Sequence, residues 1–579
     1  MGHSQSQPIP RSVRRKPSTI LSHLACATAS SSTLASIPSR ETSEFLLVNE
    51  KSSYREHEDT RRPTEAAYAY RRLSYLPPKE ILSEDDAAMA YDDFLREFPA
   101  EYRLTWILDT LRRTDFTRLK STGETYADYM GGAIYPESLI RVHTDFLHRS
   151  VLGNTHSVSN SSKLSLNCAD EARAAVLSFF RAPSEYTVVF TTNATGALKL
   201  VGESFPFSGG STYVLSADSH NSVHGIREFA TARGSRICYI PCLPHGGIDP
   251  ALAKNILLRN RPRYKDLSPS LFALTGQSNI TNSKSSLSLI EYASSLGYNT
   301  ILDAAALAPT SVVSLEDTPV DAMAVSFYKM FGFPTGVGAL VVKKSFLAQL
   351  KRPWFAGGTV DVVQVPGTVV TRSPSPHEQF EDGTINYLTL PAVTDGLRFL
   401  SAYLPFLPLR LTTLLHYVIS SLTRLRHDTT GTPVVCILSR TPSKRLRSVG
   451  EQADTGSIIS LIFLSPSGEM IPNTFVEHAA SQHKISLRTG CMCNPGGAAA
   501  ILNIQDDMKQ LYAGVTRQDF ENLMGRELGV VRISFGLASN FYDAWQVIRF
   551  ATLMSNERTR EVMWDQWTET SSAMIGQAI

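Results

Sequence analysis

Short, almost wholly apolar runs alternate with helix-forming stretches through the middle of this 579-residue chain. Residues 186–190 (YTVVF) and 211–215 (STYVL) are typical of buried strands, and residues 196–205 and 222–233 are typical of the helices that follow them. Strands that are apolar on both faces, separated by helices, form a mostly parallel sheet covered on each side. The pattern therefore predicts an α/β fold. Further strands are expected at 236–240, 271–274, 300–302, 322–326 and 338–342.

The segments on either side of this pattern have a different composition. Residues 1–80 are largely polar, and the first forty are Ser-rich with five basic residues and no acid. Such a segment is typical both of a mitochondrial transit peptide and of a disordered tail. We expect a helical segment at 81–130, a large domain at 131–390, a small α+β C-terminal domain at 391–555 and a tail at 556–579.

Composition excludes several classes of function. The 56 Lys and Arg residues nearly balance the 54 Asp and Glu residues, so no positive surplus favours nucleic acid or a membrane surface. Seven cysteines in so long a chain indicate reduced thiols and not a disulfide scaffold. The apolar stretch 400–422 is broken by Pro405, Pro408 and Arg410, so it does not predict a clean membrane-spanning helix. We expect a soluble intracellular protein, cytoplasmic unless the N-terminus directs mitochondrial import.

A lysine and an aspartate stand at the ends of two predicted strands. Lys329 follows the strand at 322–326, and Asp303 follows the strand at 300–302, 26 residues earlier. A desolvated lysine can lose its proton and form a Schiff base with an aldehyde cofactor, whereas a surface lysine keeps its charge. An acid beside the ring nitrogen keeps pyridoxal phosphate protonated there, although an aspartate at a strand end is often a helix cap. Together the two residues favour a pyridoxal phosphate site.

Two strand-to-helix junctions have residues suited to the same site. Ala194 and Thr195 lie where backbone N–H groups and a hydroxyl at a helix N-terminus would form a phosphate cradle, or where Thr195 would only cap the helix. His220 follows another strand and would either stack on a cofactor ring or cap the next helix. Neither junction decides between its two interpretations by itself.

A Gly/Pro-rich loop at 487–497 carries two thiols, Cys491 and Cys493, beside Arg488. A neighbouring cation lowers the pKa of a thiol and so favours the nucleophilic thiolate. No metal is expected, because the C-x-C pair lacks a second pair at ligand spacing. Arg532 lies within an apolar strand, where its guanidinium needs either a substrate carboxylate or a structural Asp or Glu partner.

Several motifs follow one another in a characteristic order. They are 126–133 (YADYMGGA), 153–157 (GNTHS), 326–336 (SFYKMFGFPTG), 380–384 (FEDGT), 488–494 (RTGCMCN) and 531–536 (VRISFG). In these motifs the chain closely resembles the class V aminotransferase fold, and specifically the amino-terminal, cysteine-desulfurase-like domain of molybdenum cofactor sulfurases. The resemblance implies fold type I of pyridoxal phosphate-dependent transferases, with a mostly parallel seven-stranded sheet in the large domain.

By that resemblance the large domain binds pyridoxal phosphate. Lys329 would hold the cofactor covalently, Asp303 would pair with the pyridine nitrogen, and His220 would stack on the ring. Cys493 falls where the family's persulfide-forming cysteine lies. The other implied contacts are Asn279 near the phenolic oxygen, Ala194, Thr195 and Ser326 at the phosphate, Thr384 reaching the phosphate from a partner subunit, and Arg532 and Arg488 at the substrate. The role of Thr384 implies a homodimer.

Three departures from the family pattern limit these implications. Asn193 stands where the family has a Gly, and Gly497 and Ala498 stand where the sulfurases carry another cysteine. Only 28 residues follow Ala551, so the separate C-terminal (MOSC) domain of a full sulfurase is expected to be absent. The resemblance therefore does not imply a complete molybdenum cofactor sulfurase.

Two hypotheses follow for a pyridoxal phosphate enzyme that acts on an amino acid. In the first, the chain is cysteine desulfurase-like: it converts L-cysteine into alanine, leaves a persulfide on Cys493 and passes the sulfur to an unidentified acceptor. In the second, it is a lyase that cleaves a C–C or C–S bond, or catalyses another class V reaction, on a different amino acid in specialised metabolism. A non-catalytic scaffold is disfavoured by Lys329 and Asp303, and a nicotinamide enzyme by the lack of G-x-G-x-x-G after the first strand.

Overall fold

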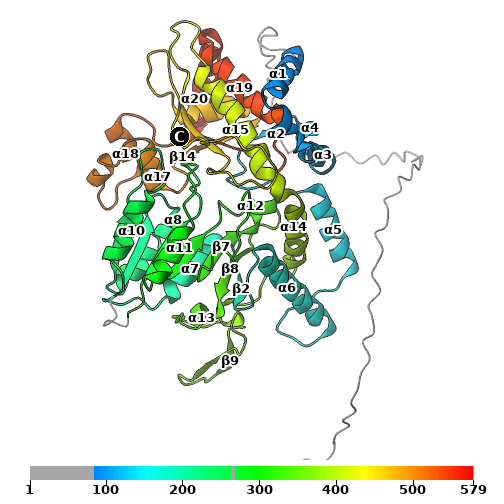
Figure 1. Cartoon of the computed structure of the whole chain (residues 1–579), viewed down its shortest axis with the longest axis vertical. Helices are drawn as coiled ribbons and strands as arrows, with labels where there is room; N and C mark the ends of the chain where they lie inside the picture. Colours follow the sequence, from blue (N-terminus) through cyan, green and yellow to red (C-terminus); the bar gives the residue numbers. More distant parts are fainter. Residues whose placement is uncertain (1–83, 263–267, 578–579) are drawn as a thin grey trace, which may run out of the picture. The chain divides into compact units, whose positions relative to one another are not determined.

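The computed structural model describes residues 84–262 and 268–577, so the expected extension at 1–80 lies outside the described residues. Seven strands form the main sheet in the order β2-β8-β7-β6-β5-β3-β4 (Figure 1). Neighbours from β7 to β4 are parallel, whereas β8 runs antiparallel to both strands beside it. The predicted α/β class and mostly parallel sheet are confirmed. The strands are β2 (Tyr186–Thr191), β3 (Thr212–Ser216), β4 (Arg236–Ile240), β5 (Leu271–Thr275), β6 (Asn299–Asp303), β7 (Ala322–Ser326) and β8 (Gly338–Lys343).

Both faces of this sheet are buried, which explains why its strands are apolar at nearly every position. In β3, Val214 packs into one hydrophobic cluster, whereas Tyr213 and Leu215 pack into another. Phe272 and Leu271 of β5 divide in the same way. Since successive strand residues point to opposite faces, the two clusters cover the two sides of the sheet. The helices that contact its strands include α6 (Asn160–Phe179), α7 (Ala194–Ser204), α9 (Ile226–Ala232), α10 (Pro250–Arg259), α11 (Ser288–Ser295) and α13 (Lys344–Leu347).

A four-stranded antiparallel sheet, in the order β11-β12-β15-β14, forms the centre of the smaller α+β domain. The segment expected as a tail at 556–579 instead forms a helix as far as Gln577, because Trp564 and Trp567 pack on Phe475 with ring centroids 5.0 and 5.7 Å away. The elements are β11 (Val435–Ile437), β12 (Ile458–Phe463), α16 (Asn473–Gln482), β13 (Ile485–Ser486), β14 (Arg488–Gly490), α17 (Pro495–Ile501), α18 (Arg517–Met524), β15 (Val530–Ser534), α19 (Phe541–Ser555) and α20 (Glu557–Gln577).

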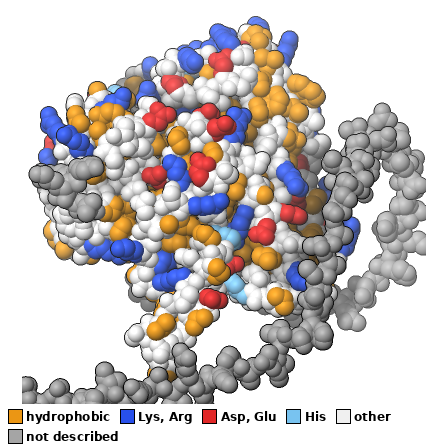
Figure 2. Space-filling model, turned by 60° about the horizontal axis from the view of Figure 1, so that its bottom comes forward, with side chains coloured by type: hydrophobic (Ala, Val, Ile, Leu, Met, Phe, Trp, Pro, Cys, Tyr) orange, Lys and Arg blue, Asp and Glu red, His pale blue; other side chains and the backbone are white. Residues whose placement is uncertain are grey.

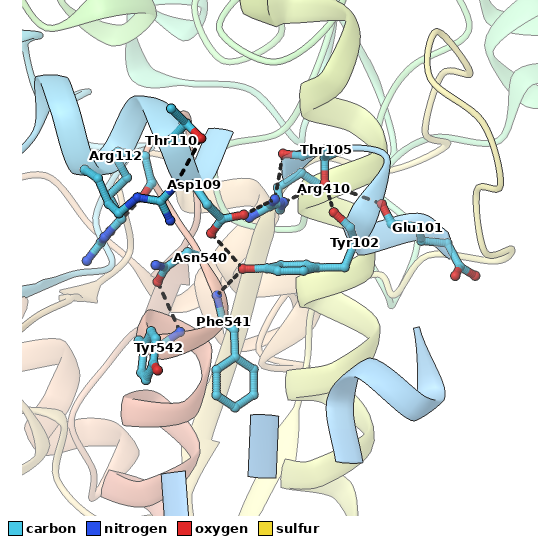
Figure 3. A network of polar contacts seen from close by, with 12 residues as sticks. Glu101, Tyr102, Thr105, Asp109, Thr110, Arg112, Arg410, Asn540, Phe541 and Tyr542 are labelled. Carbon is cyan, nitrogen blue, oxygen red and sulfur yellow. Dashed lines mark hydrogen bonds and ion pairs between the residues drawn. The ribbon is translucent and has the colours of Figure 1, made fainter. Parts of the chain in front are cut away.

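Buried polar contacts fasten the first helices to α19 and to α15 (Leu407–Arg424) (Figure 3). Arg410 of α15 is fully buried and donates a hydrogen bond to Asp109 at 2.5 Å. The Tyr102 hydroxyl donates to the other Asp109 oxygen at 2.9 Å and accepts from the backbone N–H of Phe541 at 3.1 Å. These contacts give hydrogen-bond partners to buried polar groups that no longer contact water. The first helices are α1 (Glu84–Glu97), α2 (Pro99–Arg103), α3 (Trp106–Asp115) and α4 (Arg118–Thr122).

The other described elements join these parts. They are β1 (Thr125–Tyr126), which pairs with β13, α5 (Glu137–Arg149), α8 (Asn221–His224), α12 (Phe327–Phe331), α13 (Lys344–Leu347), the hairpin β9 (Val360–Val363) and β10 (Val370–Arg372), α14 (Leu390–Tyr403), and the 3-10 helices η1 (Glu378–Phe380), η2 (Leu404–Phe406) and η3 (Asp507–Gln510). Within the described ranges, none of the helices combines the length and apolar character needed to span a bilayer. Acidic and basic side chains intermingle on the face shown in Figure 2, in keeping with the net charge of +2.

Candidate active site

A cavity of about 100 Å³ opens at the carboxyl ends of β5, β6 and β7, the edge at which open α/β sheets bind ligands. The fold thus gathers residues that lie far apart in the sequence. The predicted site residues that line this cavity are Ala194, Thr195, His220, Asn279, Asp303, Ser326 and Lys329. Those that lie outside its lining are Thr384, Arg488, Cys493 and Arg532.

Lys329 lies in α12, directly after β7, and its side chain lines the cavity. Burial lowers the pKa of this amine to about 8, because the ammonium loses hydration, and the charge of Asp303 offsets part of that effect. An appreciable fraction of the amine is therefore uncharged near neutral pH. Gly332 ends α12 with φ of +84°, and a Cβ there would lie 2.3 Å from the backbone nitrogen of Tyr135. Only a glycine allows this close approach behind Lys329.

Asp303 and His220 each line the cavity and also accept a local hydrogen bond from a backbone N–H, so a place at the cofactor site and a local structural role are compatible for both residues. The Asp303 carboxylate lines the cavity and also accepts a hydrogen bond from the backbone N–H of Ala305 at 3.0 Å. His220 caps α8, since its Nδ1 accepts from the Ser222 N–H at 3.1 Å. Burial lowers the pKa of His220, Asp303 raises it and Lys329 lowers it further. The ring is therefore neutral with its proton on Nε2, a form suited to stacking on a flat ring.

The N-terminus of α7 forms a cluster of hydroxyls and backbone N–H groups. The Ser326 hydroxyl accepts from the N–H of Ala194 at 2.8 Å, and the Thr195 and Ser222 hydroxyls lie 2.7 Å apart. Asn193, the residue that departs from the family pattern, caps the helix by accepting from the N–H of Gly196 at 2.9 Å. Its φ of −177° is extended backbone, so an asparagine fits there without strain. A helix N-terminus with such donors suits a phosphate.

Arg532 lies on β15 and has a carboxylate partner that the sequence did not single out. It is 2% exposed and donates to Asp128 at 2.7 Å and to the backbone oxygen of Asn279 at 3.0 Å. Arg488 donates to the other Asp128 oxygen at 2.9 Å. Two guanidinium groups therefore share one carboxylate, which leaves this cluster with one net positive charge. A single substrate carboxylate would complement that charge.

The thiol loop, residues 488–494, is fixed to the cavity wall by its backbone. The Cys493 carbonyl oxygen accepts from the N–H of Asn221 at 2.7 Å, one residue from His220. Met492 and Cys493 both adopt left-handed backbone, with φ of +55° and +54°. The two thiols differ, because Cys493 is exposed whereas burial raises the pKa of Cys491.

Asn494 secures the end of this loop. Its side chain is fully buried and its Nδ2 donates to Asp218 at 2.8 Å and to Asn279 at 3.2 Å. Asp218 accepts from Ser278 at 2.6 Å as well. The loop is therefore held by a buried polar network next to the cavity, although Cys493 itself stays accessible.

Thr384 lies away from the Lys329 cavity. It lines a separate cavity of about 370 Å³, and its hydroxyl accepts from Asn154 at 3.1 Å. His156 contacts the backbone oxygen of Gly383 at 3.3 Å. The motifs at 153–157 and 380–384, which are far apart in the sequence, thus meet in the fold.

Comparison with known families identifies this architecture. The model of the aminotransferase class-V family matches residues 125–425, just over half of the chain. The chain belongs to the class-V aminotransferase family. Members of this family use pyridoxal phosphate, and this chain is a pyridoxal phosphate enzyme.

Several relatives of this chain are molybdenum cofactor sulfurases. Those of Solanum lycopersicum and Bos taurus are 33% and 35% identical to it over 493 and 465 residues. The alignments cover 79% and 76% of this chain but 59% and 51% of the relatives, so the chain spans little more than half of their length.

Solved structures of two cysteine desulfurases share the fold. The enzyme of Thermococcus onnurineus has a TM-score of 0.60 at 20% identity, and the alignment covers 76% of this chain and 96% of that one. The enzyme of Escherichia coli has a TM-score of 0.59 at 18% identity, with 79% and 98% covered. At such low identity the likeness concerns the fold alone.

The residues that line the Lys329 cavity fit the cofactor. Pyridoxal phosphate needs an amine for its aldehyde, an acid for its ring nitrogen and donors for its phosphate. Lys329 offers an amine with a lowered pKa, and Asp303 offers a carboxylate close enough to influence that amine. The Thr195 hydroxyl and the N-terminus of α7 offer the phosphate donors.

Sequence reasoning missed four residues of the site. Asp128 stands in the motif at 126–133, and the need of Arg532 for a carboxylate was the clue to its role. Ser222 follows His220 by two positions, and Asn494 follows the second thiol directly. Gln277 lines the cavity as well, and its polar side chain two positions after an apolar strand was the available clue.

Proposed function

We propose that this member of the class-V aminotransferase family is a cysteine desulfurase-like enzyme. It converts L-cysteine into alanine and keeps the sulfur as a persulfide on Cys493. The names of the relatives, molybdenum cofactor sulfurase and cysteine desulfurase, support this sulfur chemistry. The acceptor of the persulfide sulfur is a further molecule with a nucleophilic atom.

The position of Cys493 is the observation that carries the proposal. Its thiol is exposed, while its backbone is hydrogen-bonded to Asn221 at the wall of the Lys329 cavity. Left-handed backbone at Cys493 presents the thiol at a sharp turn, and buried Asn494 anchors the turn from behind. A thiol that is accessible and tethered beside the cavity can meet a substrate sulfur there and afterwards an acceptor outside.

The chain's own residues bind and orient the amino acid. The Arg532 guanidinium, buried and aligned by Asp128, would bind the substrate carboxylate. Asp303 would hold the proton on the ring nitrogen of the bound cofactor, and the neutral His220 ring would cover the ring face. When bound, pyridoxal phosphate supplies an electron sink next to the α-carbon. The Lys329 amine would hold the cofactor and then move the α-proton.

Transfer of sulfur would need no external oxidant or reductant. The Cys493 thiolate attacks the substrate sulfur, so that an S–S bond forms and the bond between sulfur and the β-carbon breaks. The electron pair of that bond passes to the β-carbon, which takes up a proton. One cysteine and one protein thiol thus become one alanine and one protein persulfide, and the atoms balance.

We also propose that the enzyme is a homodimer in which Thr384 reaches the phosphate of the partner's site. Thr384 lines a different cavity from Lys329 of its own chain, which supports this role.

Formation of alanine and persulfide from L-cysteine tests the proposed reaction. The pyridoxal phosphate-loaded wild type should produce both, and Cys493→Ser should lose persulfide formation by at least about a hundredfold, since the accepting atom is gone. Cys491→Ser is the matched control, because the Cys491 thiol is partly buried with a raised pKa and should be dispensable. Loaded wild type that forms no alanine would refute the proposal and favour another amino acid as substrate.

A further inference from the structure

Gln277 has a buried side-chain amide that takes no part in the proposed reaction. It follows β5 by two positions, lines the cavity with Lys329 and Asp303, and is 1% exposed. Neither its Oε1 nor its Nε2 has a hydrogen-bond partner among the described residues. Leaving both ends of a buried amide unpaired costs free energy, so a bound ligand is the natural partner for this group.

Asn279, two residues further along, is in the opposite situation. Its Nδ2 donates to the backbone oxygen of Met492 at 2.7 Å, and its Oδ1 accepts from Asn494 at 3.2 Å. Both ends of this amide are therefore engaged by the thiol loop. The resemblance assigned Asn279 to the phenolic oxygen of the cofactor, but its Oδ1 is occupied and one of its two Nδ2 hydrogens is already donated, so a single hydrogen remains for that contact.

The strand order indicates that Gln277 lies on the side of the cofactor that carries the ring oxygen. The predicted phosphate contacts, Ala194 and Ser326, follow β2 and end β7, whereas Gln277 follows β5 on the other side of β6. In pyridoxal phosphate, the phosphate arm and the ring oxygen lie on opposite sides of the line from the ring nitrogen to the aldehyde carbon. If the phosphate lies toward β7 and the ring nitrogen at Asp303, the ring oxygen faces β5.

We propose that Nε2 of Gln277 donates a hydrogen bond to the ring oxygen of bound pyridoxal phosphate, and that Asn279 is a positioning residue for the thiol loop. The proposal rests on the cofactor-binding part of the proposed function and is independent of which bond the enzyme cleaves. Gly456, in the loop before β12, leaves room for the amide, because a Cβ there would lie 2.3 Å from Nε2. The N–H of Gly456 donates to the Asn282 backbone oxygen at 3.0 Å, which fixes that loop behind the amide.

The first test compares the apoprotein with the cofactor-bound protein for the full-length Gln277→Leu variant. Leucine fills a similar volume without an unpaired amide, so the apoprotein should unfold at an equal or higher denaturant concentration than the wild type. The Kd for pyridoxal phosphate should rise about tenfold, the value of one hydrogen bond. A purely structural role would instead lower the stability of the apoprotein. Gln349→Leu, at an exposed glutamine far from the cavity, is the matched control and should change neither quantity.

The second test is the pH titration of the absorbance of the bound cofactor. A donor to the ring oxygen favours its anionic form, so the midpoint of the absorbance change should rise by about one unit in Gln277→Leu. Gly456→Ala, which pushes the amide aside, should shift the midpoint in the same direction. Asn279→Ala should leave the midpoint in place and should speed alkylation of Cys493, because the thiol loop loses its anchor.

The outcomes separate this inference from the proposed function. An unchanged Kd and an unchanged midpoint in Gln277→Leu would overturn the inference while the enzyme remained a desulfurase. A shifted midpoint in Asn279→Ala alone would overturn it also, and would return the contact to Asn279. A wild type that binds no pyridoxal phosphate would overturn both the inference and the proposed function.

Discussion

At the scale of single residues, the burial of Lys329 should make the rate of pyridoxal phosphate incorporation depend on pH. The ordinary pKa of a lysine is 10.5, and burial lowers that of Lys329 to about 8. Only the uncharged amine reacts with an aldehyde, so incorporation of pyridoxal phosphate into the apoprotein should speed up as the pH rises and level off above about pH 8. Below that value the rate should fall about tenfold for each pH unit. Stopped-flow absorbance measures it, and a plateau only above pH 10 would contradict the burial of this amine.

The Asp128 carboxylate forms ion pairs with both Arg532 and Arg488. Asp128→Asn would leave Arg532, which is 2% exposed, with neutral acceptors alone and without an anionic partner. An uncompensated buried cation is costly, so we expect a loss of about 3 kcal/mol in the free energy of unfolding. Arg488→Gln removes the half-exposed partner and should cost less than about 1 kcal/mol. Urea unfolding measures the free energy of unfolding of both variants. Equal losses in the two variants would contradict the expectation that the buried pair contributes more to stability than the half-exposed pair.

At the scale of elements, α3 and α15 depend on the contact between Asp109 and Arg410 shown in Figure 3. Asp109→Ala leaves the fully buried Arg410 guanidinium without its carboxylate, and should lower the free energy of unfolding by about 3 kcal/mol. Asp93→Ala is the control, because Asp93 pairs with Arg96 in solvent on α1 and its loss should cost less than about 0.5 kcal/mol. Chemical denaturation followed by circular dichroism compares the two. Equal effects would mean that the Asp109 contact is as weak as a surface pair.

At the scale of the whole molecule, the proposed homodimer can be tested by mixing two inactive variants. Lys329→Ala lacks the nucleophilic amine, and Thr384→Ala lacks the donor that we assign to the partner's site. A mixed dimer has one site with both native residues, so about a quarter of the wild-type activity should return when equal amounts are refolded together, given random pairing. Each variant refolded by itself should stay inactive or weakly active. No recovery in a mixture that sedimentation shows to be dimeric would place Thr384 outside the partner's site.

The sequence by itself determined the type of fold and the chemistry of its centre. Strands such as 186–190 and 271–274 are apolar at nearly every position because both faces of their sheet are buried, and that requirement acts on each strand residue locally. Lys329 and Asp303 were predicted because each ends a strand, and parallel strands end at one edge of a sheet. The residues Ala194, Thr195, His220 and Ser326 follow the same logic and line the same cavity.

Tertiary structure decided the features that depend on partners distant in the sequence. Asp128 lies 404 positions from Arg532, and their ion pair exists only because β15 lies beside the segment that follows β1. The different roles that we propose for Gln277 and Asn279 depend on which of the two amides contacts the thiol loop. Asn279 makes that contact through its hydrogen bond to the backbone oxygen of Met492, 213 positions away. The segment at 556–579 is expected as a tail, but the rings of Trp564 and Trp567 pack on Phe475, and both residues lie in the helix Glu557–Gln577. Local patterns carry periodicity and propensity, whereas burial and pairing depend on the whole chain.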